Sequence, residues 1–288
     1  MSLSIVVEQL LNAVALAALL FLVSVGLSLV FGILRVVNFA HGVFYMLGAY
    51  LGFTVTVLSG NFWLSLALAP LLVGIIGAVL ESATLRFIYR SPPIYQLLLT
   101  FGLSLILEEG VRIAYGPTAK PMDPPPALQG AVEIAGTFYP RYRLFLIALG
   151  VLLGLCLWFF LRRTRAGLVI RAVAQNGEMA GCLGADVQRV RTAVFGFACA
   201  LAGLGGVAAA PMMSAHLGMG ISVIVDAFVV VVIGGLGSIV GSMVGSLIVG
   251  AAQTWGAFYL PETAMVIIYA VMGAILIFRP WGLFGEEE

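Results

Sequence analysis

The sequence predicts an all-α, polytopic membrane protein. Three observations support this fold class: the mean hydropathy is +1.13, only 9% of the residues are charged, and apolar runs of about 20 residues recur along the chain. A soluble protein needs far more polar residues to cover its surface, whereas about 20 apolar residues span a bilayer as one helix. The net charge is only +1, so no basic surface indicates nucleic-acid binding.

The first apolar segment, residues 9–31, is expected to be a retained membrane span. The first basic residue is Arg35, so the basic region that opens a signal peptide is missing, and no small-residue cleavage site precedes a hydrophilic domain. Further apolar segments follow at residues 42–59, 62–80, 95–115, 143–161, 191–211, 222–257 and 262–279.

Two stretches predict broken or re-entrant helices. Residues 222–257 are too long for one crossing, and the sequence GGLGSIVG at 234–241 would weaken a helix at each glycine. The sequence FGILRVVNFAHG at 31–42 places an arginine, an asparagine and a histidine between two apolar runs. We therefore expect about eight or nine transmembrane helices and a helix break in each of these two regions.

Two polar stretches are long enough to be loops, and their charge predicts the orientation. Residues 116–142 are proline-rich, whereas residues 162–191 hold six of the fourteen basic residues. Arginines close to span ends favour the cytoplasmic side. We expect loop 162–191 in the cytoplasm, loop 116–142 outside, the N-terminus outside and the C-terminus in the cytoplasm, with the whole chain, 1–288, forming one integral-membrane domain.

The cytoplasmic loop contains NGEMAGCLGADVQRV, which can form a short helix that glycines can end. One interpretation is a solvated amphipathic connector at the membrane surface. The other is a docking helix that transmits force from a cytoplasmic partner into the spans.

Four segments together carry a resemblance to a known family. Within the loop, EMAGCLG (178–184) resembles the EAA-type coupling loop of ABC importer permeases, although Met179 replaces the usual alanine and the later part of that motif is absent. With it, residues 26–50, 100–112, 171–191 and 229–250 resemble, in this order, the branched-chain amino acid permeases of ABC importers. The related urea and amide permeases share much of the pattern.

The resemblance implies a complex. In it, two permeases, expected to be a homologous heterodimer, form the pore, two cytoplasmic ATPases bind the coupling loops, and an extracytoplasmic binding protein delivers the solute. ATP and Mg²⁺ are then used by the partner ATPases, and no cofactor is expected on this chain. The coupling residues that the resemblance implies are Arg171, Glu178, Ala180 and Gly184.

The sequence itself argues against enzymatic activity. A phosphate-binding loop needs lysine followed by serine or threonine, but the only lysine, Lys120, precedes a proline. The two histidines and three scattered cysteines lack the spacing of metal ligands, so no metal site is expected. Paired catalytic groups are also missing from the spans, which disfavours an intramembrane enzyme.

The two breaks supply the candidate pathway residues. Transporters often place the solute pathway at paired discontinuities, where side chains or water satisfy the freed backbone groups. The alternative is that these glycines form a small-residue seam for close helix packing, and both uses can coexist. The candidates at the breaks are Asn38, His41, Gly42, Gly234, Gly235 and Gly237.

Asp226 is the remaining candidate pathway residue. It is expected to cap the external start of a helix, and the alternative is that it faces the pore and meets the ammonium group of a substrate.

The resemblance makes branched-chain amino acids the first choice of solute. Urea, short amides or other amino acids are the alternatives, and a secondary transporter is a further one, because broken helices alone would equally permit it. The expected location is the bacterial cytoplasmic membrane.

Overall fold

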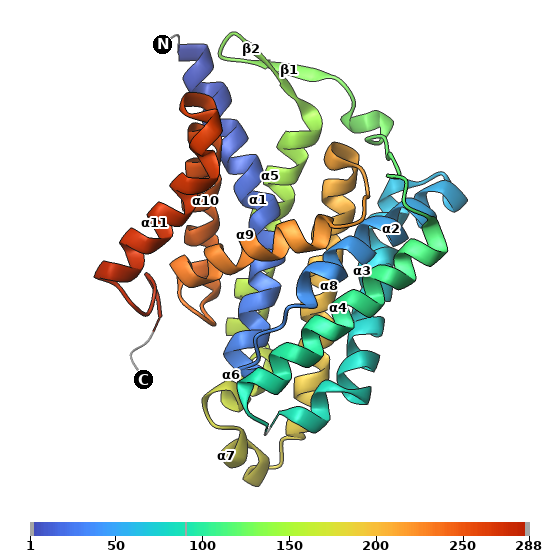
Figure 1. The fold of residues 1–288 in the computed structure, drawn as a ribbon, viewed down its shortest axis with the longest axis vertical. Coiled ribbons are helices and arrows are strands. Elements are labelled where there is room, and N and C mark those ends of the chain that lie inside the picture. The colour runs from blue at the N-terminus through green and yellow to red at the C-terminus, as the bar shows by residue number, and fades with distance from the viewer. Residues whose placement is uncertain (1–2, 90, 286–288) are drawn as a thin grey trace.

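The computed structural model describes residues 3–89 and 91–285 and is predominantly helical (Figure 1). The α-helices are α1 (Leu3–Leu34), α2 (His41–Ser59), α3 (Phe62–Ala83), α4 (Pro93–Tyr115), α5 (Arg141–Arg163), α6 (Arg165–Gln175), α7 (Gly177–Cys182), α8 (Val187–Met213), α9 (Met219–Gly234), α10 (Ile239–Tyr259) and α11 (Ala264–Phe278). Short 3₁₀ turns occupy Leu85–Ile88, Pro126–Leu128 and Pro261–Thr263.

Helix α1 is the central element. It runs along the long axis of the molecule, and it packs against α5, α8, α9 and α10 (Figure 1). It continues to Leu34, three residues beyond the predicted end, and its most apolar 18-residue window is 83% buried. A helix that is apolar on all sides and surrounded by protein belongs to the interior of a bundle.

Six of the described helices are long and apolar enough to cross a membrane: α1, α2, α3, α5, α8 and α10. Helix α9 and the 266–278 part of α11 are shorter apolar helices. Helix α4 forms where residues 95–115 predicted a span, but it falls outside these six candidates and carries Glu108, Glu109 and Arg112. The chain is therefore a polytopic membrane protein with fewer long apolar spans than the sequence predicts.

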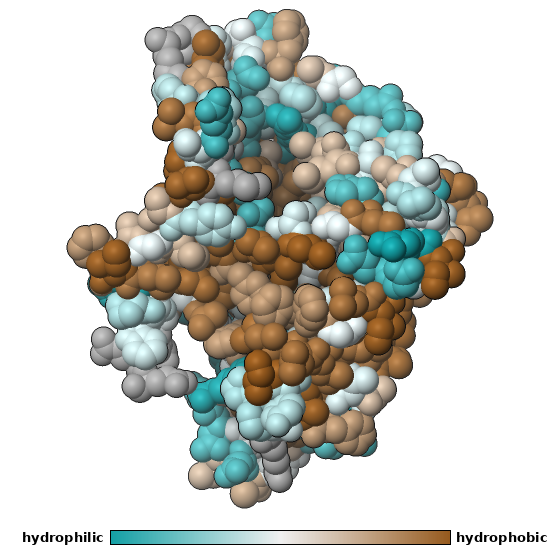
Figure 2. All heavy atoms as spheres, in the orientation of Figure 1, coloured by the Kyte–Doolittle hydropathy of each residue, from teal (hydrophilic) through white to brown (hydrophobic). Residues whose placement is uncertain are grey.

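The surface agrees with a membrane location. Figure 2 shows hydrophobic residues over the middle of the visible face and more hydrophilic residues towards its two ends. The N-terminus lies at one end of the long axis, and α6 and α7 lie at the opposite end (Figure 1). We refer to these as the N-terminal end and the α7 end.

A β-hairpin departs from the all-α prediction. Strands β1 (Ala131–Ile134) and β2 (Thr137–Pro140) pair antiparallel within the predicted loop 116–142. The two-residue turn has φ of 51° at Ala135 and 79° at Gly136, which is the left-handed backbone that two-residue hairpins prefer. The hairpin lies beside the N-terminal end of α1 (Figure 1).

Candidate functional site

The first break, residues 35–40, joins α1 to α2 and satisfies its backbone with side chains. Asn38 is fully buried, and its Oδ1 accepts a hydrogen bond from the Ala40 amide at 3.1 Å. The Phe39 amide donates to Thr100 Oγ1 of α4 at 3.3 Å. Buried backbone groups at a break need such partners, so Asn38 has a structural use here.

His41 is the first residue of α2, and its side chain contacts α1. Its imidazole is fully buried, and Nε2 lies 3.0 Å from the carbonyl oxygen of Val23. Because a carbonyl only accepts, Nε2 carries the proton. Within the described part of the chain, His41 Nδ1 and Asn38 Nδ2 are buried and have no hydrogen-bond partner. Two buried polar atoms at one break therefore retain unused hydrogen-bonding capacity.

Gly42 lies at a close crossing of α2 and α9. A Cβ atom added there would come within 2.1 Å of the Gly220 carbonyl oxygen and 2.8 Å of the Ile224 Cβ. Only glycine permits this approach. The packing interpretation thus has direct support at Gly42, while a pathway role for this residue stays a prediction.

The second break separates α9 from α10 within residues 222–257, as the glycines predict. Gly235 and Gly237 have φ of 101° and 84°, a backbone region that other residues rarely adopt. Ser238 caps α10 by accepting from the Gly241 amide at 3.0 Å. Gly234 ends α9, and a Cβ there would lie 2.2 Å from the carbonyl oxygen of Gly241.

The end of α1 contacts the second break. A Cβ on Gly237 would lie 3.0 Å from the Cα of Gly32, and the hydroxyls of Ser28 and Ser242 are 2.6 Å apart. A cavity of about 260 Å³ lies beside this contact, and Gly32, Gly237 and Arg171 are among its lining residues. One cavity therefore borders both a predicted pathway residue and a predicted coupling residue.

The predicted coupling segment folds into two short helices, α6 and α7, at the α7 end. Asn176 caps α7 by accepting from the Met179 amide at 2.9 Å. Gly184, with φ of 91°, follows α7. The Ala185 amide donates a hydrogen bond to the Ala180 carbonyl at 3.0 Å and so ends the helix. These local interactions explain why the sequence predicts a short helix ended by glycine.

The coupling residues divide into an exposed and a buried set. Arg171 and Glu178 are exposed, whereas Ala180 is only 5% exposed. Ala180 belongs to an apolar cluster that includes Leu29 and Ile33 of α1, and Ile239 at the start of α10 packs against this cluster. Helix α7 contacts α6 and α8, and both of these helices contact α1, so displacement of α7 would reach α1 and the second break through this shared cluster.

The structure contains a buried polar network at the α7 end that the sequence does not predict. Glu81 of α3 is fully buried and accepts hydrogen bonds from Tyr89 Oη and Thr192 Oγ1, each at 2.6 Å. Arg86 Nη2 donates to Thr192 Oγ1 at 3.0 Å and lies 4.0 Å from Glu81 Oε2. The network joins the end of α3 to the start of α8, directly after the coupling segment.

Tyr89 and Arg191 complete the network. Burial raises the pKa of the Tyr89 hydroxyl, and the hydrogen bond to Glu81 raises it further, so Tyr89 stays a proton donor. The Arg191 guanidinium lies 5.4 Å from the centroid of the Tyr89 ring. The sequence feature that could have revealed this network is Glu81, an acidic residue within an apolar helix. Ionisable residues at such positions in membrane proteins usually have a function.

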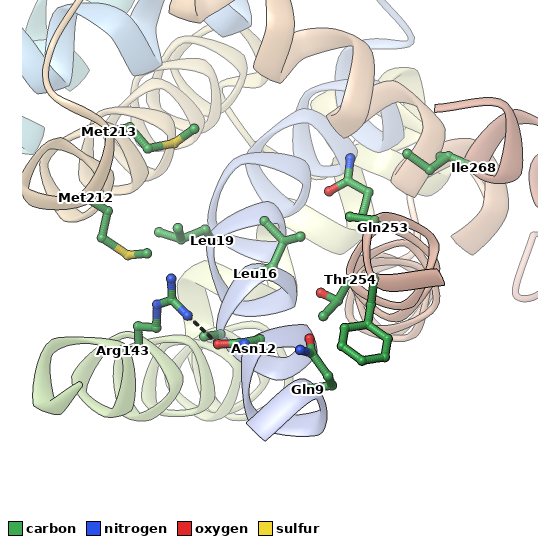
Figure 3. Close-up of a pocket in the computed structure, with 13 residues that line it drawn as sticks. Gln9, Asn12, Leu16, Leu19, Arg143, Met212, Met213, Gln253, Thr254 and Ile268 are labelled. Carbon is green, nitrogen blue, oxygen red and sulfur yellow. Dashed lines mark hydrogen bonds between the residues drawn. The ribbon is translucent and has the colours of Figure 1, made fainter. Parts of the chain in front are cut away.

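A larger cavity, of about 700 Å³, lies near the N-terminal end, where Gln9 and Asn12 of α1 line it (Figure 3). It lies between α1, α5, α8, α10 and α11 and combines polar with apolar groups. Its lining residues are Gln9, Asn12, Ala15, Leu16, Leu19, Arg143, Met212, Met213, Gln253, Thr254, Ala257, Phe258 and Ile268.

Asp226 lies beside this cavity rather than at a helix start. Helix α9 begins at Met219 after Gly218, whose φ is 83°, so the predicted capping role of Asp226 is wrong. The half-buried Asp226 carboxylate instead lies near the side chain of Gln253, which lines the cavity. The alternative interpretation, contact with a substrate ammonium, stays a prediction.

Comparison with known proteins assigns the family. A family model described as the permease component of branched-chain amino acid transport systems matches residues 9–276. The chain belongs to this family. As a permease component of the ABC transport type it is a non-catalytic transmembrane subunit.

Curated relatives match this permease over nearly its whole length. The high-affinity branched-chain amino acid permease protein BraD of Pseudomonas aeruginosa is 28% identical over 98% of the chain and 96% of its own length. LivH of Escherichia coli has the same identity and coverage. A probable LivH of Methanocaldococcus jannaschii is 28% identical over 96% of the chain and 91% of its own length. No solved structure gives a significant match.

Proposed function

We propose that this permease forms half of the translocation pathway for branched-chain amino acids in a bacterial cytoplasmic membrane. Its partners are a homologous second permease, two cytoplasmic ATPases that use ATP and Mg²⁺, and an extracytoplasmic solute-binding protein. The chain supplies the pathway and the docking surface, and the partner ATPases supply the energy. The family assignment supports the solute class and the kind of complex.

The observation that carries the proposal is the physical connection between the coupling helix and the second break. Ala180 of α7 packs in one apolar cluster with Leu29 and Ile33 of α1. The same end of α1 touches Gly237 through Gly32. Because packed interiors transmit displacement rather than absorb it, motion of α7 would reach the break.

The orientation follows from where the basic residues lie. The α7 end contains the six arginines between residues 162 and 191, and basic residues next to spans favour the cytoplasm. The α7 end is then cytoplasmic, the hairpin lies outside, and about eight helices cross or enter the bilayer. In this orientation Glu178 is exposed to the cytoplasm, and the cavity of about 700 Å³ lies in the outer half of the permease.

The test is reconstitution of the complete complex in vesicles, with Glu178→Arg in the permease. We expect the ATPases to be lost on purification, or ATP hydrolysis to continue without leucine uptake, because the charge reversal faces the docking partner. Glu133→Arg is the matched control, since Glu133 is an exposed acid on the hairpin at the opposite end.

Three outcomes would contradict the proposal. Normal coupled uptake by the Glu178→Arg complex would exclude this docking site. Uptake of urea or a short amide, but of no branched-chain amino acid, would favour the related permeases. Leucine uptake by the permease without ATP would indicate a secondary transporter.

A further inference from the structure

The cavity at the N-terminal end contains a cation without a matching anion. Arg143 is half-buried in the first turn of α5, and its Nη1 donates a hydrogen bond to Asn12 Oδ1 of α1 (Figure 3). Across residues 3–89 and 91–285, no carboxylate lies within ion-pair distance of Arg143. A guanidinium has five N–H donors, and the Tyr139 hydroxyl also lies near Arg143, so Asn12 and Tyr139 engage only part of its hydrogen-bonding capacity.

Apolar side chains lie next to this polar pair. In Figure 3, Leu16 and Leu19 lie between the Arg143 side of the cavity and the Gln253 side, and Met212 lies near Arg143. Phe258 and Ile268 extend the apolar lining on the far side. The cavity therefore combines one fixed positive charge, a neighbouring amide oxygen and a flexible aliphatic wall.

This combination matches one class of small molecule. An aliphatic α-amino acid has a carboxylate and an ammonium on one carbon and an apolar side chain beside them. Guanidinium groups bind carboxylates with two parallel hydrogen bonds, and amide oxygens accept from ammonium groups. Sulfur-containing and leucine side chains adapt to branched aliphatic groups.

We propose that this cavity is a solute-binding site of the permease, in which Arg143 binds the α-carboxylate of the amino acid. Asn12 accepts from the ammonium, and Leu16, Leu19 and Met212 contact the side chain. This inference rests on the proposed function, because it names the residues that would hold the transported solute.

Arg141 provides a matched comparison within the same helix turn. It is exposed, whereas Arg143, two residues later, is half-buried and lines the cavity. Arginines near span ends often only extend to the membrane surface, and Arg141 fits that description. A role in solute binding must therefore distinguish Arg143 from Arg141.

The experiment measures protection of a cysteine placed in the cavity. Thr254→Cys is introduced into a chain in which the two exposed cysteines, Cys156 and Cys182, are replaced by serine. The assembled complex, without binding protein, is treated with a small aqueous thiol reagent. We expect millimolar leucine to slow labelling, and isoamylamine, which has the same aliphatic group and no carboxylate, to leave it unchanged.

Substitutions at Arg143 then identify the binding group. With Arg143→Gln, we expect at least tenfold more leucine to be needed for the same protection, because charge-assisted hydrogen bonds are lost. Arg141→Gln should leave protection unchanged, and Arg143→Lys should give an intermediate value because it keeps the charge but loses the paired geometry.

The proposal is overturned if leucine and isoamylamine protect equally, if leucine gives no protection, or if Arg143→Gln and Arg141→Gln behave alike. If Arg143→Gln prevents assembly, the comparison of leucine with isoamylamine in the Thr254→Cys chain decides alone. Leucine uptake by the unmodified complex is measured in parallel. Absence of that uptake would refute the proposed function, whereas uptake without protection would refute only this site.

Discussion

Replacement of Glu81 by glutamine tests the buried network at the α7 end. The Glu81 carboxylate accepts from Tyr89 and Thr192, each at 2.6 Å, and glutamine keeps the shape but loses the charge and one acceptor. A hydrogen bond to a charged group contributes about 1.5–3 kcal/mol, against about 0.5–1.5 kcal/mol for a neutral one. With two such bonds weakened, we expect Glu81→Gln to lower the free energy of unfolding by about 2–3 kcal/mol.

Denaturant titration of the purified permease in detergent micelles measures this loss. Glu109→Gln is the control, because Glu109 pairs with Arg112 at 3.2 Å but both side chains are 55% exposed. An exposed pair of this kind contributes about 0–1 kcal/mol. The reasoning is refuted if Glu81→Gln costs no more than Glu109→Gln.

A double-mutant cycle separates the bond from general damage to the helix. Thr192→Ala removes one donor to Glu81, so its cost should shrink when Glu81 is already glutamine. We expect a coupling energy of about 1 kcal/mol between the two sites. Additive costs would mean that the 2.6 Å contact contributes nothing to stability.

Bulk added at the two breaks should separate packing from pathway roles. Gly42→Leu should prevent assembly, because its Cβ would lie 2.1 Å from Gly220 O, whereas Gly102→Leu, with open space around it, should keep both assembly and uptake. Gly237→Leu adds about 1–3 kcal/mol of backbone strain, and its Cβ would lie 3.0 Å from the Gly32 Cα, so Gly32 must shift slightly; we expect assembly with loss of uptake, and normal uptake would exclude Gly237 from the pathway. Asn38→Ala should reduce uptake more mildly, since it removes one acceptor for the Ala40 amide; unchanged uptake would make Asn38 dispensable.

The features that the sequence predicts correctly depend on neighbouring residues. The short helix α7 is capped by Asn176 and ended at Gly184, and the split within residues 222–257 is fixed by glycines with positive φ. Interactions of this kind have fixed spacing along the chain, so a pattern search detects them.

The features that the sequence does not predict depend on residues far apart in the chain or on weak local patterns. Thr192 and Glu81 are brought together only by the packing of α8 on α3, and no spacing rule links them. Asp226 suits a helix cap by composition, but Gly218 sets the start of α9. The β-hairpin has four residues per strand, which is too short to stand out in a chain dominated by apolar helices.

Helix α1 connects the proposed solute cavity to both helix breaks. Asn12 lies at the proposed solute cavity, Val23 holds His41 of the first break, and Gly32 touches the second break. Asn12 and Gly32 are twenty positions apart, about 30 Å along a helix, which is the thickness of the hydrocarbon core. Because α1 is buried along most of this length, it cannot shift at the coupling end without moving its neighbours. In the proposed complex, docking of the ATPases at α7 would thereby change the proposed solute cavity through one continuous helix.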